Sequence, residues 1–198
     1  KKNGHKKLKK IYFGTNCKFK DLKIVKKKND ILYVGTMVKR KNIMNLLRSL
    51  KYLHSSYSKL RVTFITPFNK IPLSIQNYIF DNNLKSVINF KFSVSVETLV
   101  QEYNTHKIFY YPTILEGFGM PLIEAAYCNN IIVTSDLRHH RDITLNTANY
   151  VPVDSPKLMA KKLHDILINQ NYKRDNKKII SIYNWDNSRK IFYDYYNY

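Results

Sequence analysis

Two glutamates on either side of a glycine-bearing turn are the residues whose types and spacing best suit ligand chemistry in this sequence. Residues 116–124 read Glu-Gly-Phe-Gly-Met-Pro-Leu-Ile-Glu. A carboxylate can accept two hydrogen bonds from a vicinal diol, and glycines let the backbone approach a ligand closely. Free N–H groups at the start of a helix bind anions. A ligand with an anionic centre and a diol on each side, such as a nucleotide-sugar, would satisfy the whole set.

The segments on both sides of this turn predict how it is positioned. Residues 107–111, Lys-Ile-Phe-Tyr-Tyr, are a β-branched and aromatic run that predicts a short buried strand. Pro121 fits only the first turn of a helix, so we expect a helix to begin near Met120 and to carry Glu124. The turn is therefore predicted to join a strand to a helix N-terminus, with Glu116 in the loop.

A second segment places cations where an anionic ligand could meet them. Residues 31–36 predict a buried strand, and apolar residues recur at helical spacing over residues 43–53. The loop between them carries Lys39, Arg40 and Lys41 in succession. Loops that follow parallel strands lie at the carboxyl edge of the sheet, where ligands bind. The three cations suit a diphosphate there, and the alternative is a solvated basic turn.

The pattern Glu-x-Phe-Gly-x-x-x-x-Glu of residues 116–124 resembles the family-4 retaining glycosyltransferases of the GT-B fold. In that family the first glutamate holds the transferred sugar and the second holds the ribose of the donor. The resemblance implies that Glu116 orients the donor sugar and that Glu124 holds the ribose. It also implies which backbone meets the sugar and the phosphate, namely that of Gly117, Phe118, Gly119 and Met120.

The basic loop matches a second element of the same family. That element is often Val-Gly-Thr-x-x-x-Arg-Lys-Asn, and it is complete here as residues 34–42. By this resemblance Arg40 and Lys41 grip the donor diphosphate and neutralise charge on the leaving nucleotide, as cationic clamps do in phosphate chemistry. Gly35 and Thr36 are expected to line the donor site with them.

Two departures from the family pattern leave the nucleobase unidentified. The family usually has a glycine-bearing loop where this chain has Thr-Pro-Phe at residues 66–68, and a glycine where it has Lys91-Phe92. The second position lies near the nucleobase in the family. Base recognition therefore does not follow from the resemblance.

Six short apolar runs alternate with helical patterns, which favours an α/β fold. We predict a Rossmann-like, doubly wound, mostly parallel sheet of about six strands that forms one half of a GT-B enzyme. We expect a basic tail and linker over residues 1–20, a nucleotide-sugar-binding domain over 21–183, and a C-terminal helix over 184–198. That helix would pack on the domain or cross to an N-terminal domain. The predicted strands are residues 31–36, 60–66, 87–90, 107–111, 131–134 and 150–153.

Several local features refine this outline. Residues 136–142 predict a polar loop at the same sheet edge, and a further helix is expected over residues 172–182. Asn42 and Ser95 have the residue types that cap helix N-termini. Asn129 tolerates a left-handed backbone, so we expect a tight turn there.

Composition limits the other classes of function. The 198 residues include 34 Lys and Arg against 14 Asp and Glu, giving a net charge of +20. Such a charge attracts nucleotide-sugars, acidic lipid surfaces or nucleic acid, but we find no recognised nucleic-acid motif. Two cysteines are too few for a disulfide framework. Cys and His residues lack zinc-ligand spacing, so no metal site is predicted. The resemblance also implies that the reaction needs no metal, and we expect no cofactor.

Together these observations predict a glycosyltransferase of hexosyltransferase type, with Glu116, Lys41 and Arg40 as its catalytic residues. It would transfer a sugar from a nucleoside diphosphate to a sugar, lipid-linked or protein acceptor in polysaccharide or glycoconjugate synthesis. The acceptor side would come from an N-terminal GT-B domain, so this chain alone should bind donor but transfer sugar poorly. We expect a cytoplasmic protein that can lie on an anionic membrane.

Three alternatives remain open at this point. The first is a non-catalytic nucleotide-binding module of the same fold. The second is a basic nucleic-acid-binding protein, which would show a steeply salt-dependent affinity for RNA or DNA. A sugar-nucleotide epimerase is the third and least favoured.

Overall fold

Six parallel strands form one sheet at the centre of the chain. The computed structural model describes residues 11–24, 27–169, 172 and 174–196. The strand order is β3-β2-β1-β4-β5-β6, and every neighbouring pair is parallel. The predicted doubly wound α/β fold is thus confirmed, with all six predicted strands present. They are β1 (Lys28–Val34), β2 (Val62–Thr66), β3 (Ile88–Phe92), β4 (His106–Tyr111), β5 (Ile131–Ser135) and β6 (Asn149–Val151).

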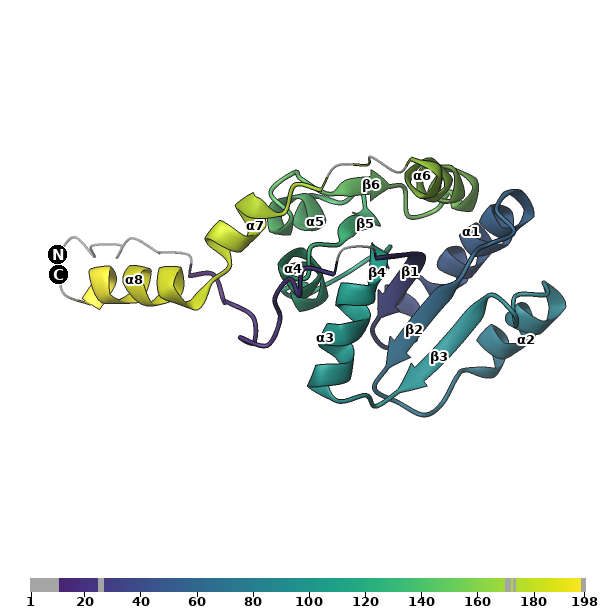
Figure 1. Ribbon diagram of the computed structural model, residues 1–198, viewed down its shortest axis with the longest axis horizontal. Helices are drawn as coiled ribbons and strands as arrows, with labels where there is room; N and C mark the ends of the chain where they lie inside the picture. Colours follow the sequence, from purple (N-terminus) through teal and green to yellow (C-terminus); the bar gives the residue numbers. More distant parts are fainter. Residues whose placement is uncertain (1–10, 25–26, 170–171, 173, 197–198) are drawn as a thin grey trace, which may run out of the picture.

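Helices cover both faces of this sheet (Figure 1). The 3-10 turn η1 (Lys39–Lys41) leads into α1 (Ile43–Ser56), which packs against α2 (Leu73–Asp81) and α6 (Pro156–Ile168). On the other face α3 (Val96–Thr105) contacts β1 and β4, while α4 (Met120–Tyr127) packs against α7 (Lys177–Ile182). The strands are therefore apolar on both sides, as parallel strands buried between helices must be.

Strand β4 shows how the two faces are used. Successive side chains of a strand point to opposite faces. Phe109 packs on Tyr103 of α3, with ring centroids 5.3 Å apart. Tyr110 points to the opposite face, where its hydroxyl lies 3.1 Å from the Ser49 hydroxyl of α1. Tyr111, two residues after Phe109, returns to the α3 face at the carboxyl end of the strand.

One local prediction is wrong, and a second is right only in part. Residues 136–142 do not form a polar loop, because α5 (Arg138–Ile143) occupies most of this segment and buries His140 and Ile143 in the core. The helix predicted over residues 172–182 is confined to α7, which begins at Lys177. In α5 the polar composition of the segment hid the burial of His140 and Ile143.

The predicted caps have mixed outcomes. Ser95 accepts a hydrogen bond from the Thr98 backbone N–H and caps α3 as expected. Asn42 precedes α1, but its left-handed backbone ends η1, and its side-chain amide donates to the Val153 carbonyl at 2.8 Å. It therefore joins two loops and does not cap the helix with its side chain. Asn129 takes the expected left-handed conformation, with φ of 57°.

The last helix, α8 (Trp185–Tyr196), extends away from the sheet beyond α7 (Figure 1). Its first turn packs on the start of the described chain, because the Trp185 indole donates to the Thr15 carbonyl at 3.0 Å. A Cβ on Gly14 would lie 2.7 Å from the Trp185 ring, so only glycine fits there. Residues 1–10 of the predicted basic tail lie outside the described residues. In the part of the chain described, a helix long and apolar enough to cross a membrane is not found.

Candidate functional site

A buried ion pair joins the basic loop to the Glu116 loop at the carboxyl edge of the sheet. Lys41 Nζ lies 2.6 Å from Glu116 Oε1, and each side chain is only 7% exposed. The same Nζ lies 2.5 Å from the Tyr111 hydroxyl and 4.8 Å from the centroid of the Tyr111 ring. A buried charge is stable only when it is paired and hydrogen-bonded, so these three side chains form one unit.

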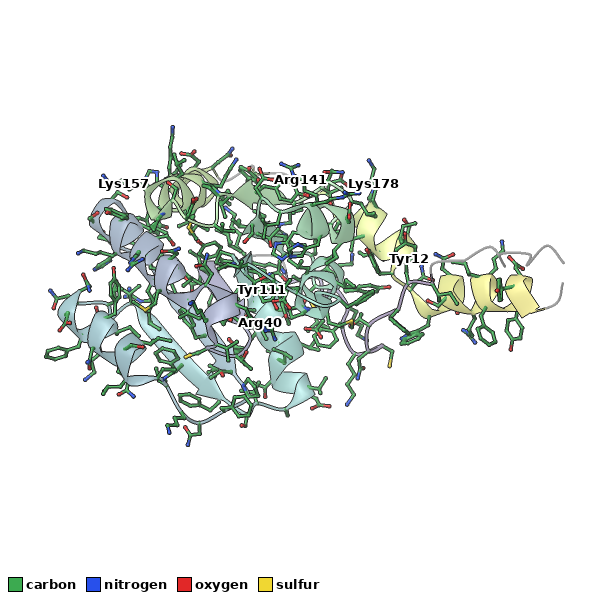
Figure 2. The ribbon with its side chains drawn as sticks, turned by 180° about the vertical axis from the view of Figure 1, so that it is seen from behind. Tyr12, Arg40, Tyr111, Arg141, Lys157 and Lys178 are labelled. Atoms are coloured by element: carbon green, nitrogen blue, oxygen red, sulfur yellow. The ribbon has the colours of Figure 1, made fainter. Side chains whose placement is uncertain are left out.

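Arg40 adds a second, more exposed cation to this unit. Its Nη1 donates to the Leu115 carbonyl at 3.1 Å and lies 3.4 Å from Glu116 Oε1. The Ile114 backbone N–H donates to the Arg40 carbonyl at 2.8 Å. The two loops are thus joined through both backbone and side chains. Figure 2 labels Arg40 and Tyr111 near the middle of the molecule.

Gly35 leaves room beside the lysine. A Cβ at this position would lie 2.9 Å from the Tyr33 hydroxyl and 3.8 Å from Lys41 Cε, and the φ of 153° disfavours other residues. The Tyr33 hydroxyl donates to the Thr36 carbonyl at 2.8 Å, which fixes the loop after β1. The predicted donor-site residues Gly35 and Thr36 therefore lie in the same loop system as Lys41.

The glycine turn reaches α4 through a left-handed residue. Gly119 has φ of 73° and is the N-cap of α4, with Pro121 in the first turn as predicted. A Cβ on Gly119 would lie 2.9 Å from Ile143, whereas a Cβ on Gly117 would meet nothing within 4 Å. Phe118 packs edge-on to Tyr183, with ring centroids 5.8 Å apart. Gly119 is thus closely packed, whereas space remains beside Gly117 in the turn that leads to Met120.

Glu124, the second acid of the motif, is held by a tyrosine and not by a cation. The Tyr103 hydroxyl donates to Glu124 Oε2 at 3.0 Å, and Tyr103 is fully buried. Burial raises the pKa of Glu124, and the Tyr103 hydrogen bond opposes that rise. The structure therefore brings Arg40, Lys41 and Glu116 into direct contact and gives Glu124 a separate, less polar setting.

A row of aromatic rings connects the two acids. Tyr103 packs on Phe109 at 5.3 Å, and Phe109 stacks on Tyr111 at 5.4 Å between ring centroids. Tyr33 lies 6.2 Å from Tyr111. Sequence reasoning missed all three tyrosines as site residues. The available signal was a tyrosine within a buried run, because a buried phenol needs a hydrogen-bond partner.

His140 was also not identified as a site residue from the sequence. His140 contacts Thr113, in the segment that leads from β4 to Glu116. Its Nε2 lies 3.1 Å from the Thr113 hydroxyl, and its Nδ1 lies 3.1 Å from the Thr134 hydroxyl and 3.3 Å from the Ser135 carbonyl. The carbonyl can only accept, so we assign the proton to Nδ1 and let Nε2 accept from Thr113. Burial is the main reason why the pKa of His140 is lowered to about 4.

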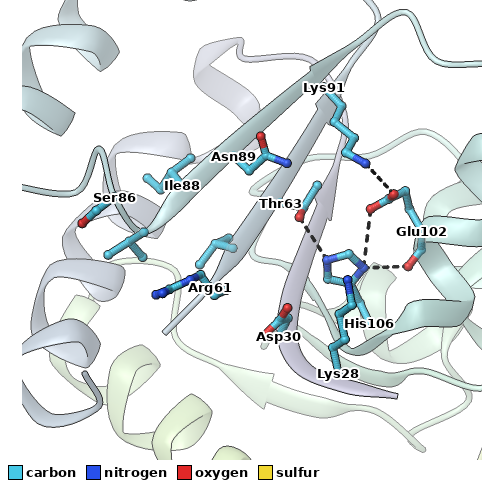
Figure 3. Close-up of a pocket in the computed structure, with 12 residues that line it drawn as sticks. Lys28, Asp30, Arg61, Thr63, Ser86, Ile88, Asn89, Lys91, Glu102 and His106 are labelled. Atoms are coloured by element: carbon cyan, nitrogen blue, oxygen red, sulfur yellow. Dashed lines mark hydrogen bonds and ion pairs between the residues drawn. The ribbon is translucent and has the colours of Figure 1, made fainter. Parts of the chain in front are cut away.

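A second polar cluster lies beside α3, near the amino ends of β1 and β4 (Figure 3). It surrounds a cavity of about 250 Å³. Lys91 Nζ lies 2.7 Å from Glu102 Oε1, and His106 bonds the Glu102 carbonyl at 2.8 Å and the Thr63 hydroxyl at 3.0 Å. Asp30 also lines this cavity. The residues predicted for the donor site all lie elsewhere.

The chemistry open to the carboxyl-edge site follows from its side chains. Two cations can bind phosphate oxygens, and two carboxylates can accept hydroxyl hydrogens. Among the described residues, no group of three or more His, Cys, Asp and Glu side chains could hold a metal ion. The arrangement suits a ligand that carries both a diphosphate and sugar hydroxyls.

Comparison with known proteins places this fold and motif in one family. Residues 15–181 match the family described as "Glycosyl transferases group 1". The chain is 31% identical over 140 residues to an O-antigen chain mannosyltransferase of Salmonella typhimurium, covering 71% of this chain and 39% of that protein. It is 29% identical over 143 residues to a capsular polysaccharide biosynthesis glycosyltransferase of Staphylococcus aureus, covering 70% and 39%. The chain thus spans about two fifths of the length of these relatives.

A solved structure agrees with the fold. The pneumococcal O-GlcNAc transferase GtfA, solved in complex with UDP and GlcNAc, superposes with a TM-score of 0.74 at 14% sequence identity. The match covers 94% of this chain and 38% of the transferase chain. The family match spans most of the chain and includes both the basic loop and the glutamate turn. This chain therefore belongs to the glycosyl transferases group 1 family, as the resemblance in its sequence predicted.

Proposed function

We propose that this chain binds a nucleoside-diphosphate sugar and that the whole protein transfers the sugar to an acceptor hydroxyl with retention of anomeric configuration. The observation that carries the proposal is the Lys41–Glu116 contact at 2.6 Å. It brings a phosphate-binding cation and a sugar-binding carboxylate together at the edge where ligands bind in open α/β sheets.

The roles follow the chemistry of each group. Arg40 and Lys41 hold the diphosphate and stabilise the charge that develops on the leaving nucleotide. Glu116 orients the donor sugar. Glu124 accepts hydrogen bonds from the ribose, and it does so only when ionised, because a protonated carboxyl has lost acceptor capacity. The backbone of Gly35, Thr36, Gly117, Phe118, Gly119 and Met120 closes around the sugar and the phosphate.

In this proposal Arg40 and Lys41 take the place of a metal ion at the diphosphate. Two positive side chains beside the diphosphate supply the electrostatic stabilisation that Mg²⁺ gives in many phosphate enzymes. The reaction would then need neither a metal nor an organic cofactor, and chelators should leave donor binding unchanged.

The relatives guide the choice of substrates. The named relatives are a mannosyltransferase of O-antigen chains and a glycosyltransferase of capsular polysaccharide biosynthesis. We therefore propose a hexose donor, with mannose among the first to test, and an acceptor in polysaccharide or glycoconjugate synthesis. The acceptor site and an N-terminal domain would lie outside this chain. A net charge of +20 also fits a protein that can lie on an anionic membrane surface.

Calorimetric titration of the 198-residue chain with UDP, GDP and their hexose conjugates tests this proposal. We expect one base to be preferred and binding to be lost in both Lys41→Ala and Glu124→Ala. Binding of neither nucleotide would refute the proposal, and tighter, salt-dependent binding of RNA would favour the nucleic-acid alternative. Donor binding without sugar transfer by the full-length protein would favour a non-catalytic module.

A further inference from the structure

Two buried tyrosines lie beside the two motif acids. Tyr103 contacts Glu124 directly, and Tyr111 is linked to Glu116 through Lys41. The Tyr111 hydroxyl accepts a hydrogen bond from Lys41 Nζ at 2.5 Å, and the same Nζ donates to Glu116 Oε1 at 2.6 Å. The Tyr103 hydroxyl donates to Glu124 Oε2 at 3.0 Å. Both tyrosines are fully buried. A buried phenol that lost its partner would be strongly disfavoured, so each tyrosine restricts where its acid can lie.

The two tyrosines belong to the packed core and not to the loops. Tyr111 ends β4, Tyr103 lies in α3, and the ring of Phe109 packs against both at 5.4 and 5.3 Å. Core side chains are close-packed and hold fixed positions. The same rigid row of rings therefore restricts the positions of both acids, Glu116 in its loop and Glu124 in its helix.

Building on the proposed function, we propose that Tyr111 and Tyr103 are positioning residues of the donor site. Tyr111 sets Lys41 and Glu116 for the diphosphate and the sugar, and Tyr103 sets Glu124 for the ribose.

Counting donors and acceptors shows what each tyrosine leaves for the ligand. An ammonium has three N–H donors. Tyr111 and Glu116 receive two of those of Lys41, so one remains for a phosphate oxygen. A carboxylate has about four lone-pair sites. Tyr103 occupies one site on Oε2 of Glu124, which leaves Oε1 and the remaining sites for ribose hydroxyls.

Tyr103 also has a consequence for pH. Burial raises the pKa of Glu124, and the donated hydrogen bond from Tyr103 opposes the rise by stabilising the carboxylate. The titratable groups that interact with Glu124 are Tyr103 from α3 and the buried Cys128 thiol at the end of its own helix. Removing the Tyr103 hydroxyl should therefore raise the pKa of Glu124 further. Ribonucleotide binding would then be lost at a higher pH than in the wild type.

Three phenylalanine variants test this assignment, and one of them is a matched control. Tyr111→Phe and Tyr103→Phe remove only a hydroxyl and keep the ring in the core. Tyr110→Phe removes an equally buried hydroxyl from the same strand, but that hydroxyl lies against Ser49 on the opposite face of the sheet. Each variant loses one buried hydrogen bond, so we expect similar decreases in the urea midpoint for all three.

The readout is calorimetric titration of each chain, between pH 5 and pH 8, with whichever of UDP and GDP the wild type binds and with its hexose conjugate. We expect about tenfold weaker binding of the conjugate in Tyr111→Phe, the loss typical of one charge-assisted hydrogen bond. For Tyr103→Phe we expect weaker binding and an acid limb moved to higher pH. Tyr110→Phe should change affinity less than about twofold, because its partner is remote from the ligand.

The possible results distinguish failure of the positioning roles from failure of the proposed function. Wild-type affinity and wild-type pH dependence in Tyr111→Phe and Tyr103→Phe would overturn the positioning roles and leave the proposed function standing. Equal losses in all three variants would also overturn them, because the effect would then follow stability alone. A wild-type chain that binds neither nucleotide would overturn the proposed function and this inference together.

Discussion

Two Lys–Glu ion pairs of nearly equal length lie in different parts of this domain. Lys41 and Glu116 are 2.6 Å apart, come from two loops 75 residues apart, and are each 7% exposed. Lys91 and Glu102 are 2.7 Å apart, come from β3 and α3, and are 35% and 13% exposed. The first pair lies at the carboxyl edge of the sheet and the second lies over β2 and β3 beside α3 (Figure 3).

The difference between the pairs is what surrounds them. Lys41 lies beside Gly35, where a Cβ would come within 3.8 Å of Lys41 Cε, and beside Tyr111, whose hydroxyl accepts from the ammonium. Glu102 is enclosed by regular structure, with His106 bonded to its carbonyl. Contact distance alone does not distinguish a ligand site from a structural pair. The two kinds of site are distinguished by whether the pair lies in loops, whether glycines lie beside it, and how deeply it is buried.

The largest expected difference is in stability. Lys41→Met should reduce the free energy of unfolding by about 3 kcal/mol, because it leaves Glu116 buried without its cation. Lys91→Met should reduce it by only about 0.5 kcal/mol, because a partly exposed pair is screened by solvent. Urea unfolding at neutral pH measures both values. Equal losses would show that the two pairs do not differ in the way their burial indicates.

The second difference concerns acid sensitivity, since each region contains one buried histidine. The pKa of His140 is lowered from 6.5 to about 4, mainly by burial, and the pKa of His106 is also lowered by burial. A lowered histidine pKa means that the folded state binds fewer protons than the unfolded state, so stability falls as pH falls. For His140 the loss begins below about pH 6.5 and is complete near pH 4.

We expect His140 to account for roughly 2 kcal/mol of that loss, allowing for relaxation around the ring. Urea unfolding between pH 4 and pH 7 would measure the slope in the wild type, His140→Gln and His106→Gln. The slope should flatten most in His140→Gln. An unchanged slope in that variant would mean that other groups cause the acid sensitivity.

The third difference concerns ligand binding and is smaller. Glu116→Gln should weaken binding of the hexose conjugate about tenfold, because an amide accepts fewer hydroxyl hydrogens than a carboxylate. Binding of the nucleotide without sugar should change less, since Arg40 and Lys41 are both still present to contact the diphosphate. Glu102→Gln is the control and should leave both affinities within about twofold. Calorimetric titration of both variants with both ligands measures these affinities. Equal effects of the two substitutions would show that the Glu116 region is no more involved in ligand binding than the Glu102 region.

Much of the fold and part of the candidate site could be predicted from local sequence. Alternation of apolar runs with helical patterns predicted about six strands in a mostly parallel sheet, because a doubly wound sheet is the common way to bury such elements. Pro121 and the two glycines predicted the strand-turn-helix around Glu116. The segment that contains α5 was the main failure. The polar composition of this segment concealed the burial of His140. Its imidazole can be buried because two hydroxyls and one carbonyl satisfy its ring nitrogens.

The sequence by itself determined which groups are present: two acids eight positions apart, two consecutive cations, and glycines beside them. Such patterns are local, so the periodicity and turn chemistry of neighbouring residues suffice to read them. Only the tertiary structure decided that Lys41 meets Glu116 and Tyr111, and that Tyr103 meets Glu124. These contacts join residues up to 75 positions apart. Strand order and side-chain packing create them, and neither is encoded within any one segment.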